Sequence, residues 1–108
     1  MYRFPLEPKE RILKKGMSTI QAEDKAGIGA LYLTTERLVF TGYAGTSISS
    51  RFWVEVPLVH IREITPAKTF ELIDNVIIID TIRQQRVRII VRDRDRWLAQ
   101  IVRQTDLL

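Results

Sequence analysis

The stretch from Gly29 to Phe40 constrains the fold of this chain more than any other segment. Apolar and polar residues alternate on both sides of a short polar break, which is the period-two pattern of two half-buried strands joined by a tight turn. Leu31 and Leu33 share one face before the break, and Leu38 and Phe40 share one face after it. The segment therefore predicts an antiparallel hairpin.

Further alternating segments predict more strands on either side of this hairpin. Residues 17–22 are expected to form the first strand, preceded by the short basic segment 11–16. Alternation resumes over residues 51–58 and again over residues 86–92. Residues 76–79 are a continuous β-branched run, which is typical of a strand that is covered on both faces.

The period changes to that of a helix near the end of the chain. Asp93 is a favourable N-cap residue, and apolar residues then recur at helical spacing from Trp97 to Thr105. Several antiparallel strands followed by one amphipathic helix indicate a mainly β fold of the α+β class. We expect residues 1–108 to be a single domain with its core at about residues 11–104, because this length suits one domain.

Four segments, in this order, resemble the GRAM domain, a branch of the pleckstrin-homology (PH) superfold: Gly29–Phe40, Val56–Ile64, Asn75–Ile79 and Arg94–Ile101. The first is similar to the family's glycine–leucine–tyrosine–leucine–threonine strand and the arginine–leucine–x–phenylalanine strand that follows it. The resemblance implies a PH-like barrel of seven antiparallel strands in two nearly orthogonal sheets, capped by the C-terminal helix. Trp97 would then lie at the seam between helix and barrel.

The residue types present give no support to catalysis or to metal binding. The chain has no cysteine, which excludes disulfides and thiolate metal sites. The only histidine, His60, stands between Val59 and Ile61, and we expect it to be structural. Gly27 and Gly29 precede a strand rather than a helix, so they do not form a phosphate-cradling loop. We therefore expect a non-enzymatic protein with no catalytic residues, no cofactor and no metal site.

The charge balance is mildly basic, with 17 Lys and Arg against 13 Asp and Glu and a net charge of +4. This excess is compatible with anionic lipid, nucleic acid or an acidic partner and selects none of them. No stretch approaches the roughly 20 apolar residues that cross a bilayer, so no transmembrane segment is expected. The absence of cysteine fits a reducing compartment. We expect a cytoplasmic location, with peripheral attachment to a membrane if the ligand is a lipid.

A first group of candidate binding residues flanks the first expected strand or begins the fourth. It consists of Lys14, Lys15, Lys25 and Arg51. In a PH-like barrel the loops that carry these cations would open at the same end. We therefore predict that they bind an anionic ligand such as a phospholipid headgroup, with ordinary solvated loop charges as the alternative interpretation.

A second group lies on the strands expected at residues 76–79 and 86–92. Its arginines face outward, where they could receive phosphates or carboxylates or protect a sheet edge. Its aliphatic residues face away from the inward set and suggest an exposed apolar patch for a protein partner or for self-association. The group consists of Val76, Ile78, Ile90, Arg86, Arg88 and Arg92.

These two groups leave the function open between classes. A protein-interaction or self-assembly module would use the second group, a phospholipid-binding module would use the first, and the two uses are compatible. The alternative is a nucleic-acid-binding small β-barrel. The basic strand favours it, but interleaved exposed aromatic residues are lacking, so no nucleic acid is expected as the partner.

Overall fold

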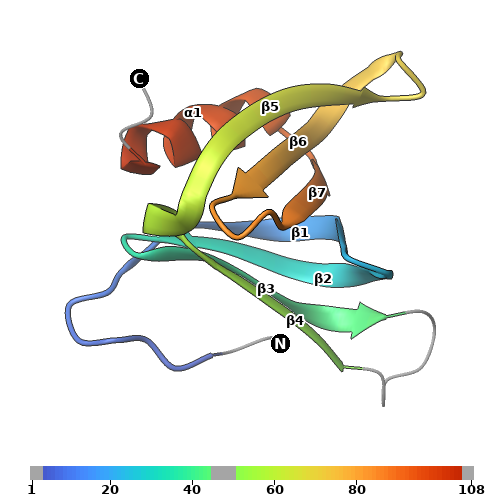
Figure 1. Cartoon of the computed structure of the whole chain (residues 1–108). Helices are drawn as coiled ribbons and strands as arrows, with labels where there is room; N and C mark the ends of the chain where they lie inside the picture. Colours follow the sequence, from blue (N-terminus) through green and yellow to red (C-terminus); the bar gives the residue numbers. More distant parts are fainter. Residues whose placement is uncertain (1–3, 45–50, 106–108) are drawn as a thin grey trace.

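The computed structural model describes residues 4–44 and 51–105 of the chain (Figure 1). Over these residues the chain forms seven strands, one 3₁₀ turn (η1) and one α-helix. In chain order they are β1 (Ile12–Ala22), β2 (Lys25–Thr34), β3 (Arg37–Ala44), β4 (Arg51–Pro57), η1 (Leu58–His60), β5 (Ile61–Thr69), β6 (Ile73–Thr81), β7 (Arg86–Val91) and α1 (Arg94–Thr105).

All seven strands belong to one antiparallel sheet with the order β4-β3-β2-β1-β7-β6-β5. Its two halves, β1–β4 and β5–β7, are joined where Ser18–Ala22 of β1 pair with β7. The sheet curls at this junction, so that β5 and β6 pass across the β1–β4 half (Figure 1). The predicted seven antiparallel strands and C-terminal helix are confirmed. The two expected sheets are the halves of this one curled sheet.

The central hairpin forms as its alternation predicts. In the pairing of β2 with β3, Leu33 lies opposite Leu38 and Leu31 lies opposite Phe40. All four side chains are at most 2% exposed and belong to the main core. Their burial fixes the register of the hairpin, because a slip of one residue would turn them all to solvent.

Strand β1 begins five residues earlier than predicted. We expected the first strand over residues 17–22, but pairing with β2 starts at Ile12 and continues through Lys14 and Lys15. The strand extends this far because β2 offers backbone partners along its whole length. Lys14 is accommodated over the ring of Trp97, with Nζ 5.2 Å from the ring centroid.

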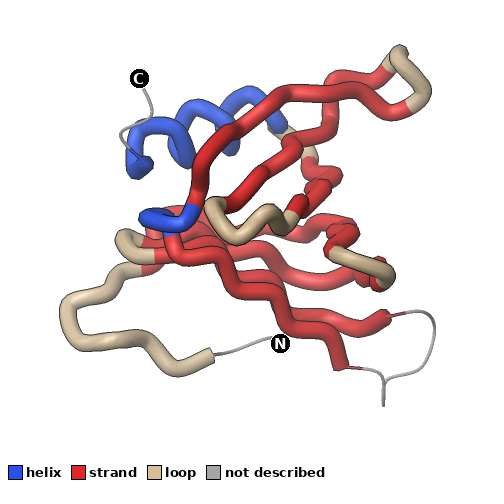
Figure 2. The backbone as a smooth tube through the Cα atoms, in the orientation of Figure 1, coloured by secondary structure: helices blue, strands red, loops and turns tan. Residues whose placement is uncertain are grey.

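Helix α1 covers the open end of the curled sheet. It packs against β5, β6 and η1, and Figure 2 shows it lying beside the β5–β7 half. Trp97 and Ile101 point into the main core and are 2% and 0% exposed. The indole of Trp97 also faces Gly16 of β1, where a Cβ atom would lie only 3.3 Å from Cζ2 of the ring. Trp97 therefore lies at the seam between helix and barrel, as the resemblance implied, and it contacts both halves of the sheet.

Replacing this indole should be far more damaging than replacing the other tryptophan. We expect Trp97→Ala to lower the free energy of unfolding by about 3–5 kcal/mol, because it removes a buried aromatic side chain and leaves a cavity. Trp53→Ala is the matched control. Its side chain is 46% exposed and makes an edge-on contact with the ring of Phe4, so about 1 kcal/mol is expected. Chemical denaturation of both variants measures the difference, and equal losses would contradict the role given to Trp97.

A buried ion pair fastens the N-terminal segment to the central hairpin. The fully buried Glu10 carboxylate accepts the Nε–H of Arg37 at 2.9 Å and the hydroxyl of Thr34 at 2.5 Å. Arg37 also donates to the carbonyl of Pro5 at 2.8 Å and lies over the ring of Phe4. Figure 2 shows the segment as a loop outside the β1–β4 half. Hydrogen bonding to Arg37 holds the pKa of Glu10 at about 2, below its ordinary 4.5, although burial acts in the opposite direction.

Thr34 connects this ion pair to the β2–β3 turn. While its hydroxyl hydrogen is directed to Glu10, its oxygen accepts the backbone N–H groups of Glu36 and Arg37, each at 3.0 Å. A threonine hydroxyl that binds backbone groups two and three residues ahead stabilises a tight turn. The turn and the N-terminal segment therefore depend on the same side chains.

The Glu10 ion pair should make stability depend on pH. Because the pKa of Glu10 is lower in the folded state, its contribution is complete above pH 4.5 and is lost as the pH falls through about 2. Glu10→Gln should lower the free energy of unfolding by about 2–3 kcal/mol at neutral pH, with a smaller difference at pH 2.

Denaturant titrations at several pH values test this expectation, with Glu36→Gln on the same turn as the control because Glu36 is exposed. A Glu10→Gln variant with the wild-type pH profile would show that the ion pair does not contribute as described.

Candidate functional site

The structure separates the four cations of the first predicted group. Lys14 and Lys15 are consecutive residues inside β1, so their side chains point to opposite faces, and Lys14 lies over Trp97. Lys25 pairs with Ala22 at the far end of β1, roughly 23 Å from Lys15 at about 3.3 Å per residue. The expectation that all four cations share one end of the barrel is therefore wrong. The reason is that Lys14 and Lys15 belong to a strand and not to a loop.

Lys25 and Arg51 do lie at a common end. Together with Glu23, Glu55 and Gln85 they line an open hollow of about 400 Å³. The β1–β2 turn with the first residue of β2, strand β4 and the β6–β7 turn supply these residues. Three segments that are distant in sequence thus meet at one end of the curled sheet.

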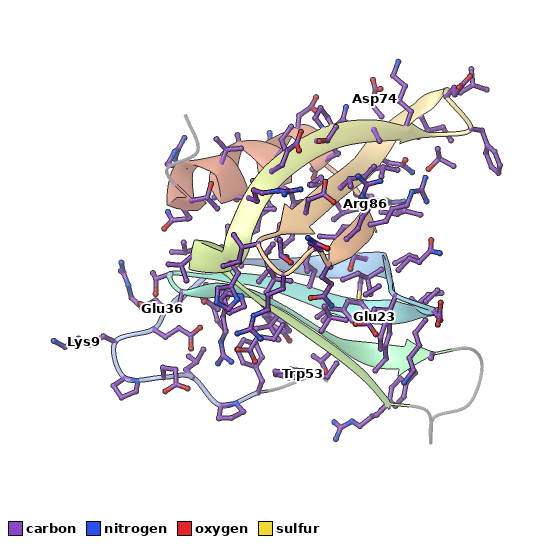
Figure 3. All side chains as sticks on the ribbon, viewed as in Figure 1. Lys9, Glu23, Glu36, Trp53, Asp74 and Arg86 are labelled. Carbon is purple, nitrogen blue, oxygen red and sulfur yellow. The ribbon has the colours of Figure 1, made fainter. Side chains whose placement is uncertain are left out.

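A second open hollow, of about 520 Å³, shares Glu23 and Gln85 with the first. Its cations come from the β6–β7 turn and from β7, and they are Arg83, Arg86 and Arg88. Figure 3 shows Glu23 and Arg86 on the same side of the molecule. We call the surface formed by Lys25, Arg51, Arg83, Arg86 and Arg88 the basic end.

The cations of the basic end are not equally available to a ligand. Arg86 is paired with Asp80, with Nε 2.8 Å from Oδ1, and this pairing raises the pKa of the guanidinium. Arg83 and Arg88 form no ion pair with any residue in 4–44 or 51–105. An incoming anion can therefore bind these two arginines without displacing a carboxylate from them.

The observed grouping of these arginines differs from the predicted one. The sequence pattern predicts Arg86 and Arg88 as part of a partner interface, with Arg83 only near that group. The β6–β7 turn lies beside the β1–β2 turn because Val87 pairs with Ala22. That pairing between distant strands was the missing signal.

The predicted apolar patch of the second group also needs correction. Val76 is fully buried: it lies between Ala67 of β5 and Ile90 of β7, and the buried Arg94 at the start of α1 donates to its carbonyl. Ile78 and Ile90 are half-buried rather than exposed. The arginines of the group do face outward: Arg86 and Arg92 are exposed and Arg88 is half-buried.

Exposed apolar side chains gather on the outer face at other positions. Met17, Ile28 and Ile73 are 62%, 64% and 54% exposed. With Ile90 and Arg92 they line an open groove of about 490 Å³. Ile90 and Arg92, which belong to the predicted second group, therefore lie beside an exposed apolar surface.

The remaining polar residues show no arrangement for metal or acid–base chemistry within the described ranges. No three His, Asp or Glu side chains there lie close enough to hold a metal ion. His60 is half-buried, and its carbonyl accepts the N–H of Ile82 at 2.8 Å, which links η1 to the β6–β7 turn. Within the described part of the chain, no helix has the length and apolar character needed to cross a membrane.

The family assignment follows from the sequence match together with this fold. The sequence profile of the GRAM domain matches residues 1–96. The chain belongs to the GRAM domain family. GRAM domains are binding modules with a PH-like fold, so the resemblance seen in the sequence is confirmed, and this GRAM domain is expected to act by binding.

A solved structure has the same fold. It is the crystal structure of the C-terminal domain of an unknown protein from Leishmania infantum, with a TM-score of 0.72 and 18% identity, covering 91% of this chain and 86% of that one. At this level of identity the likeness concerns the fold alone. Comparison with curated proteins finds no match.

Proposed function

We propose that this GRAM domain binds acidic phospholipid headgroups at its basic end and thereby attaches peripherally to the cytoplasmic face of a membrane. The observation that carries the proposal is the convergence of five cations from three segments on two adjoining hollows. The chemistry of these side chains supports a phosphate ligand, because a guanidinium can donate two parallel hydrogen bonds to phosphate oxygens.

The openness of the hollows also supports a headgroup that approaches from a surface. A buried pocket would enclose a small soluble ligand, whereas these hollows of about 400 and 520 Å³ are open to solvent. Trp53 lines the same hollow as Lys25 and Arg51 and is 46% exposed, and Figure 3 shows it at β4. Tryptophan is favoured at the boundary between lipid and water, which suits a cationic site that rests on a membrane.

Binding without catalysis is part of the proposal. Among the described residues that line the two hollows there is no histidine, serine or cysteine. Of the two carboxylates present, Glu55 is paired with Arg37, with Oε1 3.1 Å from Nη1. The basic end is therefore suited to hold an anion and not to transform it.

Charge reversal at the unpaired arginines should abolish most of the binding. Arg83→Glu/Arg88→Glu should weaken binding to phosphatidylcholine vesicles containing phosphatidylserine by roughly 30-fold or more, since each cation near an anionic surface contributes about 1 kcal/mol. Binding of the wild type should also weaken as salt is added, because salt screens these charges. Vesicle co-sedimentation measures both effects.

The matched control is Arg96→Glu/Arg103→Glu, which changes the net charge equally at two exposed positions of α1. It should retain most of the binding. If both double variants lose binding equally, net charge rather than the basic end is responsible. Binding to a soluble inositol phosphate but not to vesicles, or tighter binding to a single-stranded oligonucleotide than to vesicles, would also contradict the proposal.

A further inference from the structure

The turn between β5 and β6 exposes a group of apolar side chains far from the basic end. The hairpin projects beyond the other strands in Figure 1, and Asp74 is labelled near its end in Figure 3. Phe70 and Leu72 are 86% and 83% exposed, and Ile73 follows them at 54%. We call residues 69–73 the finger. Three large apolar side chains at the end of a projecting hairpin are unusual on a surface that meets only water.

The backbone of the finger makes this exposure more informative. The turn is closed by the N–H of Leu72, which donates to the carbonyl of Thr69 at 3.0 Å. Phe70 and Glu71 have φ values of 51° and 59°, in the left-handed region where glycine and asparagine are usual. The phenylalanine at this position is not explained by burial within the chain. Nor is it explained by the residue preference of left-handed turn positions, which favour glycine and asparagine. A contact outside the chain would explain it.

An apolar groove lies next to the finger on the same face. It has a volume of about 490 Å³, with Met17 and Ile28 contributed by the β1–β2 hairpin and Ile73 and Ile90 contributed by β6 and β7. Ile73 belongs both to the finger and to the lining of the groove. A projection and a hollow of matching apolar character are therefore contiguous on one surface.

The finger and the groove carry one pair of opposite charges that a second copy could bring together. The groove lining also includes Asp93 and Asp74, and Asp74 is already paired with Lys68 and Arg94. Glu71 is exposed at the end of the finger, and Arg92 is exposed in the lining of the groove. Within the described ranges neither side chain takes part in an ion pair. The unpaired carboxylate of Glu71 would be repelled by an anionic membrane, which disfavours insertion of the finger into the same surface that the basic end would bind.

We propose that this face is the interface of a two-fold symmetric dimer, in which the finger of each copy enters the groove of the other. When a surface carries both a projection and a matching groove, a two-fold rotation places the projection of each copy in the groove of the other. This is the self-complementary geometry of isologous dimers. Phe70 and Leu72 then lie against Met17, Ile28 and Ile90 of the second copy. Glu71 lies within reach of Arg92 of that copy. This inference goes beyond phospholipid binding and does not depend on it.

The first test is the mass of the full chain in solution. Light scattering over a range of concentrations should show a rise from 12.6 kDa to twice that mass. Phe70→Asp, in the finger, and Ile28→Asp, in the groove, should each give a monomer at all concentrations. Val59→Asp is the matched control because Val59 is 84% exposed but lies on η1, outside the finger and the groove. It should leave the dimer intact.

The second test identifies the pairing of residues across the interface. Glu71→Lys and Arg92→Glu should each raise the dissociation constant of the dimer about fivefold or more, because each places like charges together twice. An equal mixture of the two single variants should restore dimers, since both contacts of the mixed dimer then join opposite charges. Both residues are exposed, so circular dichroism is expected to show unchanged folding of these variants.

Several results would overturn the inference. A monomer at every concentration would exclude the dimer, and a dimer that survives Phe70→Asp would exclude this interface. Failure of the mixed charge variants to restore association would exclude the proposed pairing. A monomer that loses vesicle binding on Phe70→Asp would assign the finger to the membrane instead. Vesicle binding that is unchanged by Phe70→Asp keeps the two proposals separate.

Discussion

Trp97 holds the two halves of the curled sheet together by contacting both of them. The halves are joined edge to edge only through the five residue pairs between β1 and β7. A sheet that curls around so short a junction leaves the inner side chains open to water at one end. Trp97, which is carried on a helix packed against β5 and β6, covers that end and lies against Gly16 of β1. The apolar area that it buries holds the curl closed.

The same junction creates the two surfaces to which we assign binding. Because Ala22 pairs with Val87, the β1–β2 turn and the β6–β7 turn lie side by side, and their cations form the basic end. At the opposite end of the junction the last residue pair is Ser18 with Val91, and beyond it β1 and β7 diverge. The apolar groove lies at this divergence, between the two halves of the sheet. A change in the β1–β7 pairing would therefore alter both surfaces together.

The sequence predicted those parts of the structure that face a single core. Leu31, Leu33, Leu38 and Phe40 alternate because one face of their hairpin is buried, and the helical spacing around Trp97 follows from the same cause. These patterns are local, so they can be read without knowledge of the tertiary structure. They were sufficient for the fold class, the central hairpin and the C-terminal helix.

What the sequence could not predict depends on partners that are distant along the chain. Lys14 and Lys15 interrupt the apolar alternation, and only the length of β2 shows that β1 includes them. Alternation placed Val76 on the outward face with Ile78, and only the tertiary structure shows that Val76 is buried there while Ile78 is not. Arg83 joins the candidate site only through the β1–β7 pairing.

The ion pair of Glu10 with Arg37 had no local signal at all, because it joins residues that are 27 positions apart. Long-range pairing of this kind is set by the curl of the sheet and by the register of its strands. The sites on this molecule therefore depend on tertiary geometry more than the fold class does.

Helix α1 is an integral part of the curled sheet's core, and native-state hydrogen exchange can test this. The backbone amides around Ile101 in the middle of α1 should be as strongly protected as those of β2, and both should exchange only when the whole chain unfolds. Rapid exchange of the α1 amides by local opening, while the β2 amides remain protected, would contradict it.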